Sequence, residues 1–195
     1  MGESRDGAVG ASTIWTFALR VIAWLAPCFA LWYLAADWQG RLVGWIARFL
    51  VSFDGHDLVR GLEFGDRLIV FVTRVEIHYL GRIVSVTPQV SPLVYTYGLP
   101  LFLALMLASR ASWQRILLGA VVLLPFEAWG VAFDFLSQVA IRAGHEASVN
   151  SGYSEWAREF VGLGYQMGAL IFPTLAPVAT WAILERRFIA EKLVR

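Results

Sequence analysis

The chain alternates long apolar stretches with shorter polar ones. A helix needs about 20 mostly apolar residues to cross the hydrocarbon core of a bilayer. Four stretches approach or exceed that length, at residues 13–36, 92–109, 113–141 and 161–185. This pattern predicts an all-α polytopic membrane protein with four transmembrane helices.

The polar stretch between the first two spans, residues 37–91, contains two further patterns. Aromatic and aliphatic residues recur at helical spacing over 37–51, which predicts an amphipathic helix lying in the membrane interface. Residues 68–80 and 83–87 are rich in β-branched residues and predict a small extramembrane β-hairpin, while 52–67 reads as a loop. Because a lone hairpin is only marginally stable in water, we expect it to pack against another surface.

Three further polar segments complete the predicted organisation. Residues 1–12 are expected to be a flexible tail, 142–160 an outer loop and 186–195 a tail on the inner side. Basic residues concentrate on the inner side of membrane proteins, and one topology collects a group of six of them there. It places both termini and the short link at 110–112 in the cytoplasm, with Arg110, Arg115, Arg186, Arg187, Lys192 and Arg195.

Composition supports a membrane protein and excludes several other classes. Hydrophobic residues make up 58% of the 195 residues, and the mean hydropathy is +0.61, above the usual range for soluble domains. The formal net charge is +1, so the chain has no basic field that would attract nucleic acid. Its single cysteine, Cys28, excludes an intrachain disulfide.

The third apolar stretch carries ionisable side chains within the membrane. Glu127 and Asp134 are seven residues apart and Gln138 follows four later, so the three share one helical face. Such groups are costly in hydrocarbon and need a polar partner or water. In one interpretation they dock a basic residue of another membrane protein. In the other, Glu127 pairs within the chain, with Arg20 of the first span as a candidate, and Asp134 is solvated near the headgroups.

Two alternative functions remain open at this stage. A membrane enzyme would use Cys28 or one of three histidines expected on the outer face, which are His56, His78 and His145. A small ion or proton carrier would use Glu127 and Asp134. The histidine spacing matches no metal-ligand pattern, and the chain contains no hydrolase, P-loop or dinucleotide motif. We therefore expect no cofactor and no metal.

Two segments, PLVYTYGLPLFLALMLAS at 92–109 and EAWGVAFDFLSQVAI at 127–141, resemble the exosortase H-associated membrane proteins. The resemblance extends loosely over the whole chain. It implies a protein of the bacterial inner membrane with an accessory role beside an exosortase, a membrane transpeptidase that processes proteins with a C-terminal sorting signal. The expected partners are the bilayer and another membrane protein, either the exosortase or its substrate. The resemblance supplies no catalytic residue.

Overall fold

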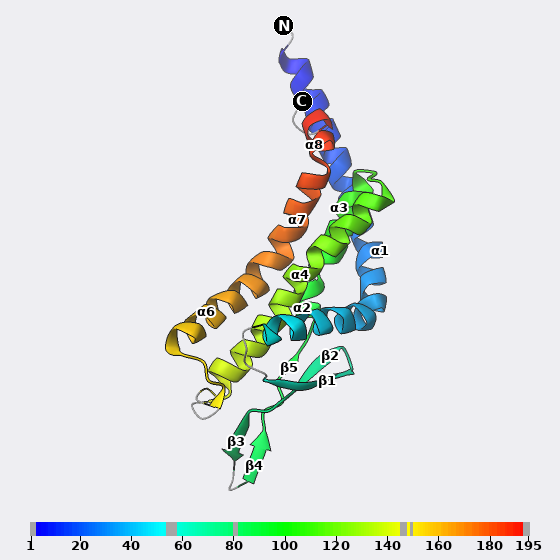
Figure 1. Cartoon of the computed structure of the whole chain (residues 1–195). Coiled ribbons are helices and arrows are strands. Elements are labelled where there is room, and N and C mark those ends of the chain that lie inside the picture. Colours follow the sequence, from blue (N-terminus) through cyan, green and yellow to red (C-terminus); the bar gives the residue numbers. More distant parts are fainter. Residues whose placement is uncertain (1–2, 54–57, 80–81, 145–147, 149, 193–195) are drawn as a thin grey trace. The chain divides into compact units, whose positions relative to one another are not determined.

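The computed structural model describes residues 3–53, 58–79, 82–144, 148 and 150–192, and its chain divides into two compact units. Unit 1 comprises residues 1–34, 97–123 and 174–195, and unit 2 comprises 35–96 and 124–173. Three helices continue from one unit into the other along the chain. Figure 1 identifies the elements by label and colour.

Helices dominate the structure, and three of them are long and apolar enough to cross a membrane. In the described part of the chain these lie at Ile14–Ser52, Trp113–Arg142 and Glu155–Leu184. They correspond to α1 (Glu3–Ser52), to α4 (Trp113–Ser137) with the π-helical turn η1 (Gln138–Arg142), and to α6 (Glu155–Gln166), η2 (Met167–Ile171) and α7 (Phe172–Leu184). The sequence pattern predicted four spans. The predicted second span instead forms a shorter apolar helix, Leu93–Ala108, divided into α2 (Leu93–Thr96) and α3 (Gly98–Ala108).

Several helix ends differ from the predicted ones. The first helix begins at Glu3, so residues 3–12 are helical, and it includes residues 37–51, which were predicted to form a separate helix. The last span begins at Glu155, six residues before the predicted start. Ser154 accounts for this start, since its side chain accepts a hydrogen bond from the Ala157 amide at 3.3 Å, as N-cap residues do. After α7, residues Arg186–Lys192 form α8.

The polar segment after α1 forms two small sheets, which differ in detail from the predicted hairpin. Three antiparallel strands have the order β1-β2-β5, and a separate two-stranded sheet pairs β3 with β4. Their bounds are Val59–Gly65, Leu68–Thr73, Glu76–Tyr79, Arg82–Ser85 and Gln89–Val90, for β1 to β5 in order. The predicted loop at 52–67 therefore contains a strand, and the predicted strand at 68–80 is two strands.

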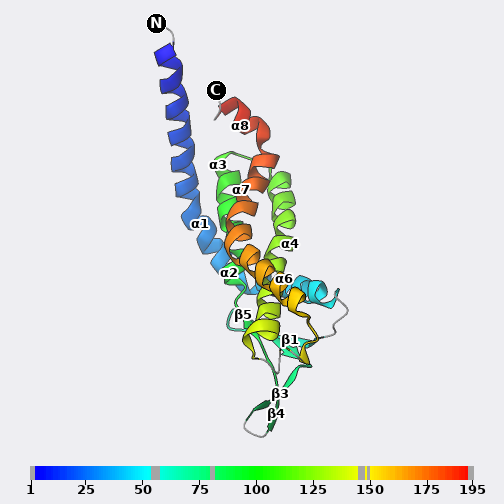
Figure 2. The ribbon, with the colours of Figure 1, turned by 90° about the vertical axis from the view of Figure 1, so that its left-hand side faces the viewer.

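Thr73 explains why the second strand stops where it does. Its hydroxyl accepts a hydrogen bond from the Val75 amide at 3.2 Å and donates one to the Val86 carbonyl at 2.6 Å. A side chain that bonds to the backbone two residues later competes with the strand ladder and turns the chain. The β3–β4 pair consequently extends away from β1 and β2 (Figure 2).

The core of unit 2 lies between the sheet, the C-terminal part of α1 and α4. Alternate residues of β2 are buried, as expected for a strand with one covered face. Phe71 of β2 stacks on Phe135 of α4 with ring centroids 4.5 Å apart. From α1, Val43 and Ala47 are fully buried in the same cluster. The sheet is thus anchored to the unit through β2, as the marginal stability of an isolated hairpin requires.

Unit 1 has a second apolar cluster, which Phe102 and Met106 of α3 and Trp181 of α7 share. Phe17 of α1 stacks on Trp181 with ring centroids 5.6 Å apart. At one end of this unit, Arg115 and Glu185 form a salt bridge of 2.9 Å. The start of α1, the α3–α4 link and α8 lie toward that same end of the unit (Figures 1 and 2).

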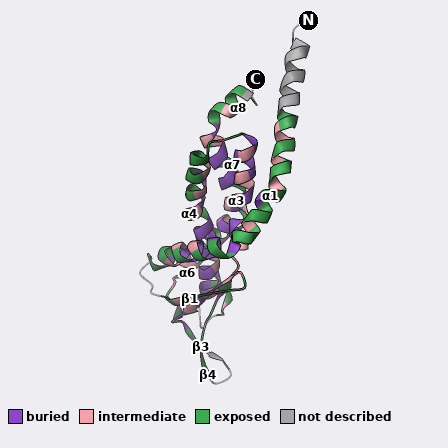
Figure 3. Ribbon diagram, turned by 90° about the vertical axis from the view of Figure 1, so that its right-hand side faces the viewer, coloured by how far each residue is buried: buried purple, intermediate pink, exposed green. Residues whose placement is uncertain are grey.

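Much of α1 is exposed (Figure 3), and many of its exposed residues are apolar. Trp15, Leu19, Ile22, Leu31 and Leu34 are between 63% and 80% exposed. A soluble protein rarely leaves such a surface in water, whereas a bilayer solvates it.

Candidate functional site

The polar residues of the α4 span divide into two groups, and the first is a buried pair. Glu127 is 5% exposed, and its Oε2 accepts a hydrogen bond of 2.9 Å from Nε2 of Gln39 in α1. Gln39 is equally buried. The other oxygen of Glu127, Oε1, is buried and has no hydrogen-bond partner among the described residues. Only one of the two carboxyl oxygens of Glu127 therefore has a hydrogen-bond partner among the described residues. The sequence pattern did not single out that partner, Gln39.

The second group surrounds Asp134, whose side chain is 14% exposed. Its Oδ1 lies 3.7 Å from Nη1 of Arg142 and accepts a hydrogen bond of 3.3 Å from Nε2 of Gln138. The Tyr95 side chain of α2 is also hydrogen-bonded to the Asp134 carboxyl group. Asp134 therefore has one cationic and two neutral partners from the same chain.

The same group ties three further elements to the end of α4. Gln138 also donates to the carbonyl of Gln89 in β5 at 2.9 Å. The Arg142 guanidinium lies over the ring of Tyr165 in α6, 4.6 Å from its centroid, and is hydrogen-bonded to that side chain. Because each group in this set bonds to at least one other, it links α2, β5 and α6 to η1.

The predicted site residues therefore come together only in part. Asp134 and Gln138 are in direct contact, whereas Glu127 belongs to a different pair. Arg20, the candidate intrachain partner of Glu127 in one interpretation, is exposed on α1, and the residue that donates to Glu127 is Gln39. Arg142 lies eight residues after Asp134 and continues the same helical spacing. The sequence could therefore have identified it as a member of the Asp134 group. Gln39 and Tyr95 were not, since only the tertiary fold brings them to α4.

Small residues allow α4 and the last span to approach closely. A Cβ atom on Gly168 would lie 2.8 Å from the Cα of Gly130, too close for any side chain. Four residues earlier, the Gly164 carbonyl accepts a hydrogen bond of 3.1 Å from Nε1 of Trp129. Small residues spaced by four commonly form such contacts between membrane helices. This small-xxx-small face is thus occupied within the chain.

The structure describes only one of the groups considered for a membrane enzyme, Cys28. Cys28 is 2% exposed, which leaves its thiol little access to a substrate. His56, His145 and the His78 side chain lie outside the described part of the structure. Elsewhere in the described residues, no three His, Cys, Asp or Glu side chains gather as metal ligands would.

The β3–β4 sheet presents a different kind of surface. All four residues of β4 are exposed, and two of them are apolar, with Ile83 at 64% and Val84 at 44% exposure. Among the described strands, β4 pairs only with β3, so its other edge has no strand partner. Such an edge offers backbone donors and acceptors to an added strand.

These features define a small integral membrane protein with internally paired polar residues and a two-stranded sheet, β3–β4, in which one edge of β4 has no partner among the described strands. The chain belongs to the exosortase H-associated membrane protein family, whose model matches residues 11–188. It is therefore an exosortase-associated membrane protein. Searches of curated proteins and of solved structures give no match.

Proposed function

We propose that the protein is a non-catalytic accessory subunit of a bacterial exosortase-type protein-sorting system in the inner membrane. It acts by docking to the exosortase through strand β4. A substrate of the exosortase is the alternative occupant of β4.

The open β4 strand carries this proposal. Ile83 and Val84 follow one another, so they point to opposite faces of the strand, and each face exposes an aliphatic side chain outside the long apolar helices. Exposed strands with unpaired edges are a hazard that proteins normally suppress with charge or proline. Within β4 only Arg82 is charged. A family defined by association with a membrane enzyme supplies a partner for this edge.

The polar residues within the spans support a structural role better than a docking role. Asp134 and Gln138 are engaged by groups of the same chain, and Glu127 is too deeply buried for a side chain of another protein to reach. Arg20 lies near the N-terminal end of the first span. In this proposal its long side chain extends to the headgroups, as arginines near span ends do.

We further propose four spans with both termini in the cytoplasm. The helix Leu93–Ala108 has 16 residues and is about 24 Å long at 1.5 Å per residue, somewhat less than the hydrocarbon thickness of about 30 Å. Local thinning of the bilayer accommodates such a mismatch at modest cost. A phosphatase reporter active only in the periplasm, fused after Arg195, should be inactive. An active fusion contradicts this topology.

Co-purification tests the docking proposal. The protein and the exosortase of the same host, solubilised in a mild detergent, should elute together. The variant Ile83→Ser/Val84→Ser should reduce the co-eluting enzyme by about tenfold, because it removes the apolar contact. The matched control Ile83→Val/Val84→Ile keeps the strand apolar and should retain the enzyme. If the natural chain does not co-elute, docking is wrong. If the serine variant co-elutes normally, β4 is not the surface.

A further inference from the structure

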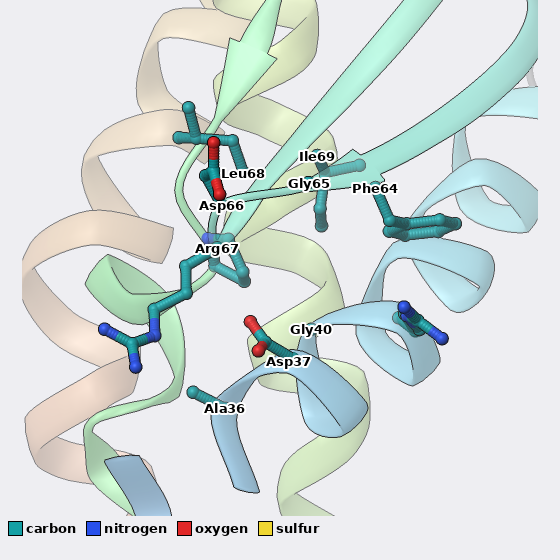
Figure 4. Close-up of a pocket in the computed structure, with 11 residues that line it drawn as sticks. Ala36, Asp37, Gly40, Phe64, Gly65, Asp66, Arg67, Leu68 and Ile69 are labelled. Carbon is teal, nitrogen blue, oxygen red and sulfur yellow. The ribbon is translucent and has the colours of Figure 1, made fainter. Parts of the chain in front are cut away.

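Unit 2 contains a polar cavity of about 390 Å³ between α1 and the β1–β2 turn. Ligand pockets in proteins start at about 300 Å³. Four charged residues line it, two from α1 (Asp37 and Arg41) and two from the turn (Asp66 and Arg67). In Figure 4 the Asp37 carboxylate points from α1 toward the turn, and the Arg67 side chain extends from the turn back toward α1.

The cavity exists because the sheet approaches α1 closely on one side. Gly44 allows this approach, since a Cβ atom there would lie 2.9 Å from the ring of Phe64 and 3.1 Å from Ile69. At Gly40 a Cβ atom would lie 3.0 Å from the Pro92 ring and would narrow the cavity, which both residues line. The cavity therefore has a fixed apolar wall and a charged rim.

The turn residues adopt a backbone conformation that favours glycine. Asp66 has a φ of 47° and Arg67 a φ of 59°, both in the left-handed region. A two-residue turn of this kind normally carries Asn-Gly or Asp-Gly. An arginine in the second position raises the energy of the turn. The Arg67 side chain distinguishes this turn from one with glycine in the second position, and this side chain lines the cavity.

Exposed aromatic residues near the cavity are of the kind that lie among lipid headgroups. Trp38, Trp45, Phe49 and Phe53 are between 55% and 77% exposed. Their spacing of seven, eleven and fifteen from Trp38 puts them on one helical face. That face is opposite the buried Val43 and Ala47, and suits the boundary between headgroups and acyl chains. Asp37 and Arg41 lie along one side of this aromatic face.

The charge balance of the rim selects the ligand class. Two arginines and two aspartates carry a net charge of zero, so a simple anion would meet two carboxylates and a simple cation two guanidinium groups. Among the described residues Asp37, Arg41 and Asp66 form no ion pair, whereas Arg67 already takes part in another interaction. A group with a phosphate and an ammonium matches both signs, because arginine binds phosphate through paired hydrogen bonds and a carboxylate binds ammonium.

We infer that this cavity binds the zwitterionic headgroup of a membrane phospholipid of the phosphatidylethanolamine class. The phosphate lies against Arg41 and Arg67, the ammonium against Asp37 and Asp66, and the acyl chains leave along the aromatic face of α1. Free phosphoethanolamine shares the headgroup chemistry but lacks the acyl chains.

Native mass spectrometry of the full chain in detergent tests this inference. Titration with dioleoylphosphatidylethanolamine should give one tightly bound lipid. Dioleoylphosphatidylglycerol and free phosphoethanolamine should each bind at least about tenfold more weakly, because one lacks the ammonium and the other the acyl chains. Arg41→Ala and Arg67→Gly should each weaken lipid binding about tenfold. The matched control Arg60→Ala removes an exposed arginine of β1 that does not line the cavity, and should bind normally.

Each departure from this result overturns a defined part of the inference. Equal binding of the phosphatidylglycerol lipid contradicts the zwitterionic ligand class. Equal binding of free phosphoethanolamine contradicts a lipid source. Unchanged binding in Arg67→Gly, a variant compatible with the turn, contradicts the site itself. Equal losses in Arg60→Ala show a general charge effect and also contradict the site.

Discussion

Glu127 and Gln39 illustrate how a single polar contact stabilises a buried carboxyl group. Burying a polar group costs free energy unless it is hydrogen-bonded, and a buried carboxyl group retains the need for several donors. Here Gln39 supplies one donor at 2.9 Å to Oε2, and Oε1 has no partner among the described residues. Loss of Gln39 alone therefore leaves a buried carboxyl group without a donor, whereas loss of both residues removes both polar groups.

Gln39→Leu should destabilise the protein by about 3 kcal/mol, because it leaves the whole Glu127 carboxyl group buried without a donor. The double variant Gln39→Leu/Glu127→Leu should recover to within about 1 kcal/mol of the natural chain, since it removes both polar groups. Thermal unfolding in detergent measures both. A double variant less stable than Gln39→Leu alone contradicts this account of the pair.

Gly168→Ala should destabilise the protein by about 1–3 kcal/mol, because the new methyl group would meet the backbone of Gly130 at 2.8 Å. The matched control is Gly162→Ala in the preceding helical segment, where the nearest atom is 3.8 Å away and belongs to the flexible end of Ile141. That variant should not destabilise the protein, and the higher helix propensity of alanine should stabilise it by up to about 1 kcal/mol. Equal effects of the two substitutions in the same unfolding assay contradict the close packing at Gly168.

At the scale of elements, the β1–β2 turn combines an unfavourable backbone with a charged side chain. Glycine adopts left-handed φ values without steric cost, whereas arginine does not. Arg67→Gly should therefore raise the free energy of unfolding by about 0.5–1 kcal/mol in lipid-free detergent. A decrease in the unfolding temperature would instead show that the Arg67 side chain contributes more to the fold than its backbone conformation costs.

The apolar elements are largely predictable from the sequence, because their length and hydropathy carry the signal. The third span was predicted at 113–141 and forms a helix and π-turn over Trp113–Arg142. The strands are harder to predict from the sequence. Strand β1, VRGLEFG, contains two glycines and two charges, which obscure its alternation. The break after Thr73 depends on hydrogen bonds to Val75 and Val86, which only the folded chain reveals.

The contacts of the polar residues also divide into two kinds. Contacts between residues close in sequence can be predicted from spacing, and contacts made by the tertiary fold cannot. Helical spacing correctly places Asp134 next to Gln138, since the two are four residues apart on one helix. Spacing carries no information on Gln39, 88 residues from Glu127, or on Tyr95. Both carboxyl groups have a hydrogen-bond partner within the chain, Gln138 for Asp134 and Gln39 for Glu127.

For the whole molecule, the two units differ in the surfaces they leave uncovered. Unit 1 exposes apolar side chains of α1 that a bilayer solvates. Unit 2 adds the β3–β4 sheet, in which β4 exposes Ile83 and Val84. Lipid accounts for the first surface, and an exosortase is the proposed partner for the second. The polar residues inside the spans bond to groups of the same chain and are not proposed to contact the exosortase.

Site-specific photocrosslinking in cells tests this assignment of surfaces most directly. A photoreactive amino acid at position 84 in β4 should capture the exosortase, while the same group at position 138, in the polar part of the third span, should capture no partner protein. Capture of the exosortase from position 138 and not from position 84 would contradict docking through β4. It would return the partner contact to the polar residues of the membrane span.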